Sequence, residues 1–465
     1  MKININFKTT AEVTERTIKI AEAFGLGIDD EKDFVIYNNL DLDIKEKDIV
    51  YITGDSGGGK TVLLNELKKY FSEHIDYDEL EINPDETLIE GVGKDLNDAV
   101  KILSLVGLND AFLFLRKYKE LSDGQKRRYK LAKMLERPES VWFFDEFLAT
   151  LDREMAKIIA FNVQKIARRY EKTVIVATTH RDLEKDLSPN VILDKKFNDD
   201  YSLKYRDNPN DHKCSLYDEN IEVRVGTKSD YMKLEKFHYR NENTGPVRRY
   251  VVMTKNSVVV GCIVVTYPLV QLKGRNQIFP RYKKSSTENV KHLNENFECI
   301  ARIIIHPKYR CIGFAQYLLK EYFDKFLKTK YVETVAVMPK YNPFFSKAGM
   351  TWVKYDNTVN EYENLMNELR KLNFNIDLLY SKKYVKRIYD NLSERDKESY
   401  KKIFKELYRR AKGVNRVKKE LTIEMLNDEN FITDLSRMLR ADLQYYYKEN
   451  TGPIEENSKL ENYFN

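Results

Sequence analysis

Apolar and polar residues alternate along two stretches near the start of the chain, residues 3–7 and 40–44. A period of two is typical of a β-strand with one face on a core and the other in solvent. Three later stretches, residues 49–53, 141–144 and 174–177, are largely apolar and only strand-sized. Such runs predict strands buried on both faces, as in a parallel sheet. The first part of the chain is therefore predicted to have an α/β fold.

The pattern changes after a polar stretch at residues 195–220. Beyond it, residues 221–225 alternate like an edge strand, and residues 249–253 and 258–265 predict a strand pair joined by a short turn. Residues 229–239 have helical spacing. Strands and helices mixed in this way predict a second domain of the α+β class.

The last hundred residues carry aromatic and aliphatic side chains at helical spacing among many charges. This pattern predicts a helical C-terminal tail. The predicted segments are an α/β domain at 1–195, a linker at 196–220, an α+β domain at 221–355, a basic helical extension at 356–448 and a disordered tail at 449–465.

Composition narrows the class of protein. A chain of 465 residues exceeds what one hydrophobic core organises, so two or three domains are expected. The longest apolar runs are shorter than the roughly 20 residues that span a bilayer, and the N-terminus lacks a signal-peptide core. The four cysteines form no CxxC pair, as is typical of a reducing compartment. We therefore expect a cytoplasmic protein with no membrane segment.

Positive charge is concentrated near the C-terminus. The formal net charge is +6, while residues 381–420 contain fifteen Lys or Arg against six Asp or Glu, a balance of +9. A basic helix suits binding to phosphates, with an affinity that falls as salt rises. A solvated helix face explains the same pattern, so nucleic-acid binding through residues 381–420 and a plain surface helix both stay open.

A glycine-rich stretch follows the apolar run at residues 49–53. Its sequence, GDSGGGKT, fits the GxxxxGK[ST] pattern of a P-loop. Backbone N–H groups of such a loop surround a β-phosphate, the lysine neutralises phosphate charge, and the hydroxyl that follows ligates Mg²⁺. The expected ATP-binding residues are Gly54, Asp55, Ser56, Gly57, Gly58, Gly59, Lys60 and Thr61, with Thr61 also a Mg²⁺ ligand.

Two further apolar strands lead to candidate catalytic groups. The run at residues 141–144 ends in Asp145 and Glu146. We expect Asp145 to ligate Mg²⁺ and Glu146 to polarise the attacking water, although a carboxylate that only caps the strand would give the same pattern. The run at residues 174–177 leads to His180, which is placed to contact the γ-phosphate.

Together these motifs resemble the ATPase domain of ABC proteins over residues 36–194. The resemblance also rests on Leu-Ser-Asp-Gly-Gln at residues 121–125, with Asp123 where the family usually has glycine, and on Leu151-Asp152. In that family the first motif caps ATP bound to the partner's P-loop, and the second, the D-loop, lies at the dimer interface. The resemblance implies a head-to-tail homodimer that encloses two ATP molecules. The residues implied to cap the partner's ATP are Ser122, Gly124 and Gln125.

Two features depart from the transporter members of that family. No glutamine precedes Gln125, so the family's Q-loop glutamine, which couples Mg²⁺ and water to the helical subdomain, is missing. Glu81, Asn83 and Glu86 are the candidates to replace it. Only 59 residues separate the P-loop from the signature at 121–125, which excludes the long coiled coil of chromosome-organising relatives.

A second phosphate-binding pattern occurs at residues 299–323. A strand there ends at His306-Pro307, and a turn then opens an amphipathic helix. Small residues at 313 and 315 let backbone N–H groups at the helix N-terminus approach a pyrophosphate. The stretch resembles motif A of GNAT acyltransferases, whose Arg-x-x-Gly-x-Ala turn binds CoA. The resemblance implies that acetyl-CoA is held by Arg310, Cys311, Ile312, Gly313, Phe314 and Ala315, and that strand amides at Ile304 and Ile305 polarise the thioester carbonyl.

The catalytic groups of this second half are less defined. Phe345 occupies the position where many GNAT enzymes carry the tyrosine that protonates the leaving thiolate, so Tyr341, another group or water would supply that proton. Glu298 is a candidate base, and a carboxylate in a loop explains it equally well. If neither group acts, the second half is a CoA-binding or structural module.

The order of the two halves resembles proteins in which an ABC-type ATPase is fused to a GNAT-like acetyltransferase. The predicted function is a soluble ATP-binding and ATP-hydrolysing protein coupled to CoA-dependent acetyl transfer, that is, an ATPase and acyltransferase. One alternative is a nucleic-acid-modifying ATPase with a GNAT-like domain. Another is the ATP-binding subunit of an ABC transporter with a non-catalytic CoA-binding module. The acyl acceptor and the pathway stay open.

Overall fold

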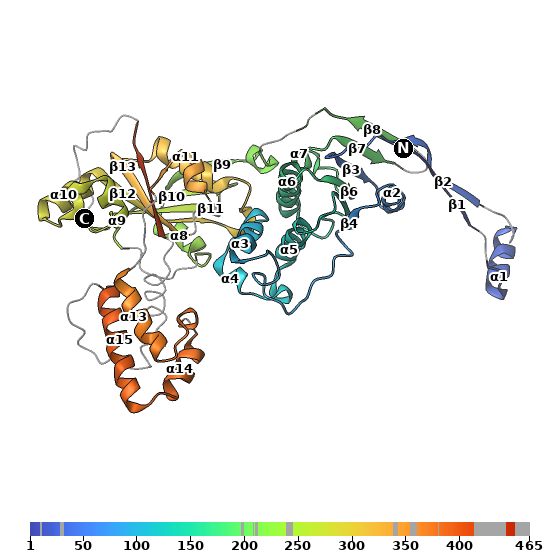
Figure 1. Cartoon of the computed structure of the whole chain (residues 1–465). Coiled ribbons are helices and arrows are strands. Elements are labelled where there is room, and N and C mark those ends of the chain that lie inside the picture. Colours follow the sequence, from blue (N-terminus) through green and yellow to red (C-terminus); the bar gives the residue numbers. More distant parts are fainter. Residues whose placement is uncertain are drawn as a thin grey trace.

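Two β-sheets, each with its own helices, account for most of the computed structural model (Figure 1). A β-hairpin extends from the first sheet, and a helical cluster lies beside the second (Figure 1). In the described part of the chain, no helix combines the length and the apolar character that crossing a bilayer requires. The structure describes residues 1–9, 12–27, 32–196, 200–207, 209, 213–238, 245–337, 343–353, 360–379, 381–412 and 443–451.

The hairpin consists of β1 (Lys2–Thr9) and β2 (Lys32–Asp41), which pair antiparallel. Its base is buried against the first sheet, because Ile3, Ile5 and Tyr37 belong to the same core cluster as the P-loop strand. The strand predicted at residues 3–7 is thus confirmed, whereas the one predicted at residues 40–44 is confirmed only at 40–41, because β2 ends at Asp41. The helix α1 (Glu15–Phe24), which the sequence reading did not predict, lies between the two strands in the chain.

The first sheet contains the three predicted buried strands. Its strand order is β4 (His74–Asp76), β5 (Val141–Phe144), β6 (Thr173–Ala177), β3 (Ile49–Gly54), β7 (Val191–Lys195) and β8 (Tyr201–Tyr205). All neighbours pair in parallel except β7 and β8. Because parallel strands end at one edge of a sheet, the residues that follow β3, β5 and β6 are brought together there.

Six helices accompany this sheet. They are α2 (Lys60–Lys68), α3 (Leu96–Leu105), α4 (Ala111–Phe114), α5 (Asp123–Leu135), α6 (Arg153–Arg169) and α7 (Glu184–Leu187). The side chain of Asp152 caps α6 by accepting the Met155 N–H at 3.1 Å, which fixes where the longest of them begins.

The second sheet has seven strands. Their order is β14 (Thr351–Val353), β15 (Leu443–Glu449), β13 (Tyr331–Val337), β12 (Phe297–Ile305), β11 (Val258–Thr266), β10 (Val247–Lys255) and β9 (Ile221–Gly226). Only β12 and β13 run parallel, and they pair only at residues 297–299 and 331–333. The register between β11 and β12 shifts between Val264 and Val265, which marks an irregularity in this strand pair.

Five helices of the described residues accompany the second sheet: α8 (Lys228–Glu235), α9 (Lys273–Ile278), α10 (Thr287–Asn296), α11 (Phe314–Lys325) and α12 (Phe344–Lys347).

A separate helical cluster lies within residues 360–412. It contains α13 (Asn360–Lys371), α14 (Lys382–Asp390) and α15 (Glu394–Lys412), which share a core of their own. Within the basic segment at 381–420, Lys386, Lys397 and Lys401 form ion pairs along their own helices. Binding of nucleic acid there stays a prediction.

Two predicted boundaries are wrong. The helical extension was expected to continue to residue 448, yet β15 lies between β13 and β14, so the helical cluster is an insertion within the second domain. The expected linker at 196–220 contains β8, which completes the first sheet, and Cys214 and Leu216, which are buried in the second core. Of the tail at 449–465, only residues 449–451 are described.

The two halves also share a hydrophobic core. Ile158 and Phe161 of α6 are buried in the cluster that contains Leu318 and Leu319 of α11. Because α6 carries this contact on one side and packs with the first sheet on the other, the two halves are joined through this helix.

Candidate functional site

The P-loop is folded as a cradle at the end of β3. Gly54, Gly57 and Gly59 all have positive φ, between 76° and 140°. Gly59 has no room for a side chain, because an added Cβ would lie 2.3 Å from Ile36 Cγ2 in the hairpin. Lys60 donates from Nζ to the carbonyl oxygens of Gly54 at 3.0 Å and Asp55 at 2.6 Å. The loop therefore has the shape and the charge that suit a nucleotide phosphate.

The residues expected to hold Mg²⁺ converge from two elements. Thr61 lies in the first turn of α2, and Asp145 follows β5. The Thr61 hydroxyl donates to Asp145 Oδ1 at 3.2 Å, so the two oxygens already lie next to each other. A hydroxyl and a carboxylate oxygen beside a phosphate cradle are ligands that Mg²⁺ prefers. The pair fits the predicted metal site.

Glu146 is held in an uncommon backbone conformation. Its φ is 43°, in the left-handed region that non-glycine residues seldom adopt, and its side chain is exposed. Its N–H donates to Asp145 Oδ1 at 2.8 Å. Strain of this kind is often kept at functional sites.

His180 is tied to the loop that leads into α6. Arg153, the first residue of that helix, donates to His180 Nδ1. Arginine has only donors, so Nδ1 must accept, and Nε2 then carries the proton that it donates to the Leu148 carbonyl at 3.2 Å. Arg153 also pairs with Asp182 at 2.8 Å. No sequence motif marks Arg153, although it is the residue that holds the predicted catalytic histidine.

The signature residues lie at the N-terminus of α5. Ser122 and Asp123 are exposed, and Gly124 and Gln125 are partly exposed. The Ser122 N–H donates to Gln125 Oε1 at 3.0 Å, which uses the glutamine side chain to start the helix. The signature turn is thus presented to solvent, as a contact with a second protomer requires.

Asp78, which the sequence reading did not select, lies where β4 runs beside β5. Burial and the neighbouring Asp76 raise the pKa of the Asp78 carboxyl, and a hydrogen bond with the backbone of Asp145 partly offsets this. Tyr77 links the same segment to α5, because its carbonyl accepts from Lys130 Nζ at 3.3 Å. Asp78 therefore contacts the backbone of Asp145. The three candidates to replace the Q-loop glutamine, Glu81, Asn83 and Glu86, make no contact with Asp145 among the described interactions.

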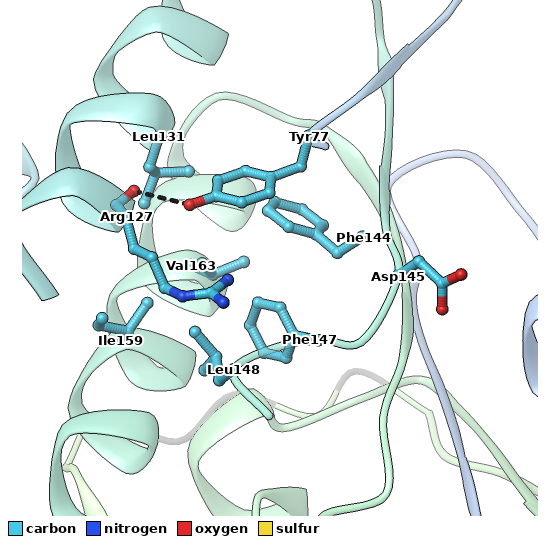
Figure 2. A pocket seen from close by; sticks show the side chains of 9 residues that line it. All are labelled: Tyr77, Arg127, Leu131, Phe144, Asp145, Phe147, Leu148, Ile159 and Val163. Carbon is cyan, nitrogen blue, oxygen red and sulfur yellow. Dashed lines mark hydrogen bonds between the residues drawn. The ribbon is translucent and has the colours of Figure 1, made fainter. Parts of the chain in front are cut away.

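A small pocket lies behind this edge of the sheet. Figure 2 shows the Asp145 carboxylate directed away from the apolar side chains that line it. The Tyr77 hydroxyl donates to the Arg127 carbonyl at 3.4 Å across the pocket (Figure 2). Because most of its lining side chains are apolar and the Asp145 carboxylate is directed away from them, we assign the pocket to packing between α5, α6 and β5, and not to nucleotide binding. The lining residues are Tyr77, Arg127, Leu131, Phe144, Asp145, Phe147, Leu148, Ile159 and Val163.

In the second half, the predicted CoA-binding turn faces the first half. Arg310 pairs with Asp110 of the first half at 3.3 Å and donates to the carbonyls of Ile305 and Phe237. The Cys311 thiol donates to the Ser104 carbonyl at 3.4 Å. In this structure the Arg310 guanidinium is therefore engaged with protein groups, contrary to the expectation that it faces a pyrophosphate.

The side chains of the other residues in that turn are buried, small or absent, so only their backbone N–H groups could contact a ligand. Ile312 and Phe314 are buried in the second core, and so are Ile304 and Ile305 within the sheet. Gly313, with φ of 94°, precedes the first residue of α11, and Ala315 follows in the first turn. Any anion site here would consist of the N–H groups at the start of α11.

Glu298, the candidate base, is completely buried. Arg249 donates to its carboxylate, and the Tyr322 hydroxyl donates to Oε1. A carboxylate enclosed by an arginine and a tyrosine has no access to an acceptor substrate. We therefore treat Glu298 as part of a structural ion pair. Tyr341 lies outside the described residues, and Phe345 is buried against Tyr446.

Comparison with known proteins supports the interpretation of the first half. No family model matches the chain. The methionine import ATP-binding protein MetN of Clostridium tetani is 30% identical over 200 residues, 35% of this chain and 62% of that protein. The iron import ATP-binding protein FbpC of Photobacterium profundum is 28% identical over 182 residues, 31% of this chain and 50% of that protein. The chain thus spans about half to three fifths of the length of these relatives.

Among solved structures, a dimeric ATP-binding cassette bound to ADP and Pi is 20% identical, with a TM-score of 0.32, and covers 44% of this chain and 100% of its own. The matches with the curated proteins and the geometry of the P-loop, Thr61, Asp145 and the signature turn lead to one conclusion. The first half of this chain is similar to ABC-type ATP-binding proteins, and its P-loop, Thr61 and Asp145 are arranged in a way that suits a nucleotide phosphate and Mg²⁺.

Proposed function

We propose that the chain hydrolyses ATP at the edge of the first sheet. The observation that carries this proposal is the 3.2 Å contact between Thr61 and Asp145, with Glu146 next in the chain. The P-loop and Lys60 would hold the phosphates, Thr61 and Asp145 would hold Mg²⁺, and Glu146 would accept a proton from the attacking water. The most direct test is Glu146→Gln, in which ATP turnover should fall while ATP still binds.

The working form of this ATPase is proposed to be a head-to-tail homodimer. Its support is the exposed signature turn at Ser122 and Asp123 and the resemblance of that turn to the ABC signature. In the dimer, the N-terminus of α5 in one protomer would face the nucleotide on the P-loop of the other. The positive end of the α5 dipole then adds to the charge of Lys60.

Asp78 is proposed to replace the missing Q-loop glutamine. Substitution Asp78→Asn keeps the size of the side chain but removes its negative charge beside Asp145. We expect ATP turnover to fall at least about tenfold, with ATP binding little changed, because the carboxylate would act on Mg²⁺ or water and not on the nucleotide itself. Steady-state phosphate release measures this. The matched control is Glu79→Gln, at the next, exposed position; equal turnover in both variants would remove Asp78 from the site.

For the second half we propose a GNAT-type domain that binds CoA. Three observations support it: the seven-stranded order with a single parallel pair, the separation of β12 from β13 after residue 299, and the αL glycine that begins α11. Strands that separate in this way leave backbone N–H groups for a ligand, and a shift of register beside the gap is often found at binding sites. The N–H groups of Gly313, Phe314 and Ala315 would hold the pyrophosphate.

Binding of CoA tests this proposal. Gly313→Ala is expected to weaken CoA binding at least about tenfold, since φ of 94° disfavours any side chain and the added Cβ would lie 2.9 Å from the Tyr217 hydroxyl. Gly349→Ala is the control, because Gly349 has a similar φ of 93° and its added Cβ would meet only the flexible end of Lys448, at 3.6 Å. Calorimetry with CoA would measure both. Absence of CoA binding by the unmodified chain would exclude a CoA site.

An ATP-binding subunit of a transporter is the second candidate. Its support is that both relatives are described as import ATP-binding proteins. In that case the chain would dock on an integral membrane protein, and the second half would be a regulatory module. Co-purification of a membrane protein, together with absence of CoA binding, would favour this candidate over acetyl transfer. Acetyl transfer would be favoured instead if mass spectrometry detected an acetylated amine after incubation of the chain with ATP, acetyl-CoA and an amine acceptor.

A further inference from the structure

The turn after β12 contacts the ATPase domain through several residues. Residues 306–313 contact elements on the helical side of that domain (Figure 1). Arg128 of α5, which is buried, donates to the Lys308 carbonyl at 3.2 Å. Lys165 of α6 donates to the Cys311 carbonyl at 2.7 Å. The turn is thus fixed by the signature helix and by α6 at once.

Within this contact, Lys308 binds two carboxylates at the start of α6. Its ammonium group lies 2.8 Å from Asp152 Oδ1 and 2.7 Å from Glu154 Oε2. The Tyr309 hydroxyl donates to Glu154 Oε2 at 2.9 Å, and Lys255 at the end of β10 also pairs with Glu154. The Lys308 side chain is 24% exposed and that of Glu154 31%, so water screens this ion pair less than one at an open surface, whereas the Asp152 side chain is 59% exposed.

Asp152 and Glu154 lie on either side of Arg153. Asp152 ends the predicted D-loop and caps α6, and Arg153 holds His180. Lys308, from the second half, therefore contacts the residues on both sides of Arg153. Arg153 in turn orients His180. The chain of contacts runs from Lys308 through the first turn of α6 to the predicted γ-phosphate contact.

We propose that Lys308 of the second half is a positioning residue for ATP hydrolysis in the first half, acting through Asp152, Glu154 and Arg153 on His180. The proposal rests on the proposed ATPase function. It gives the second half a direct effect on turnover, whatever ligand that half binds. Without the ammonium group, the Asp152 and Glu154 carboxylates that it holds together repel each other, and Asp152 loses its ion pair with the second half.

Two variants of the full chain test this. Lys308→Met keeps the aliphatic stem and removes the charge, and we expect kcat for ATP to fall between about fivefold and 100-fold with KM little changed, because nucleotide contacts stay intact. Lys308→Arg should restore most of the activity. The control is Lys325→Met, whose lysine pairs only with Glu321 on the exposed side of α11 in the described contacts.

A second readout does not depend on turnover. Hydrogen exchange followed by mass spectrometry should show faster exchange at residues 150–156 and 178–182 in Lys308→Met, with residues 49–54 unchanged. If turnover and exchange of Lys308→Met both equal those of the unmodified chain, the proposal is wrong, whereas a chain that releases no phosphate at all contradicts the proposed ATPase function itself. In that second case the exchange pattern still decides whether Lys308 positions His180.

Discussion

Replacing Glu146 with glutamine is expected to lower the ATP turnover of the full chain at least about 100-fold while ATP still binds. Glutamine has the size of glutamate but cannot accept a proton from water. The rest of the site should stay intact, because the backbone N–H of residue 146 keeps its bond to Asp145 Oδ1 and the contact of Thr61 with Asp145 does not involve the side chain.

The same variant should accumulate as an ATP-bound dimer, because hydrolysis is the step that would release it. Phosphate release measures the first effect, and sedimentation with and without ATP measures the second. Glu171→Gln is a matched control: Glu171 is also exposed and also has a positive φ, of 53°, but it lies beyond α6 and pairs with Lys47. Turnover of Glu146→Gln within about twofold of the control would show that Glu146 is not the base.

Substitution Arg275→Met is expected to destabilise the second sheet by about 3–5 kcal/mol. Arg275 is fully buried and donates to Glu333 Oε1 at 2.8 Å and to the carbonyls of Leu269 and Val270. Removing the guanidinium leaves the carboxylate of Glu333 buried without its cation. Breaking one partner of such a pair costs far more than replacing both.

Hydrogen exchange at residues 331–337 and 443–449 should become faster, which would report the loss of stability in the second sheet. Exchange at residues 141–144, in the first sheet, should change little. The double variant Arg275→Met with Glu333→Gln is the control and should regain much of the stability, because it removes both charges. A single variant as stable as the unmodified chain would show that this pair contributes nothing to the second sheet.

The stability of this region should also depend on pH. Burial raises the pKa of Glu333 to about 7, against the opposing effect of Arg275. Because the folded-state pKa lies above the ordinary value of 4.5, the folded state binds the proton more tightly. Its contribution to stability is complete below about pH 4.5 and is lost as the pH rises through about 7, so Glu333→Gln should flatten that dependence.

Much of the ATPase site could be predicted because its signals are local in the chain. The P-loop, Asp145 and His180 each follow an apolar strand, and parallel strands place their ends at one edge. Asp78 and Arg153 could not be found in this way. Asp78 is brought near Asp145 by the pairing of β4 with β5, which no local pattern encodes, and Arg153 looks like any exposed arginine in the first turn of a helix.

The second half shows where sequence patterns stop being informative. The spacing of its strands was sufficient to predict the α+β class. The position of residues 443–449 in the sheet was not predictable in this way, because it depends on pairing with β13 across the helical insertion. Glu298 was selected for its place before a strand, yet alternation puts it on the inner face beside Tyr322. The engagement of Arg310 with Asp110 joins residues 200 apart in the chain, and only the docking of the halves brings them together.

Phosphate release by the full chain, measured with Mg²⁺ and ATP over a range of protein concentrations, tests the central claim most directly. An ABC-type site completed by a second protomer predicts Mg²⁺-dependent release whose rate per chain rises with protein concentration to a plateau, and which Lys60→Ala abolishes. Release that is absent at every concentration, or unchanged in Lys60→Ala, would contradict ATP hydrolysis at this site.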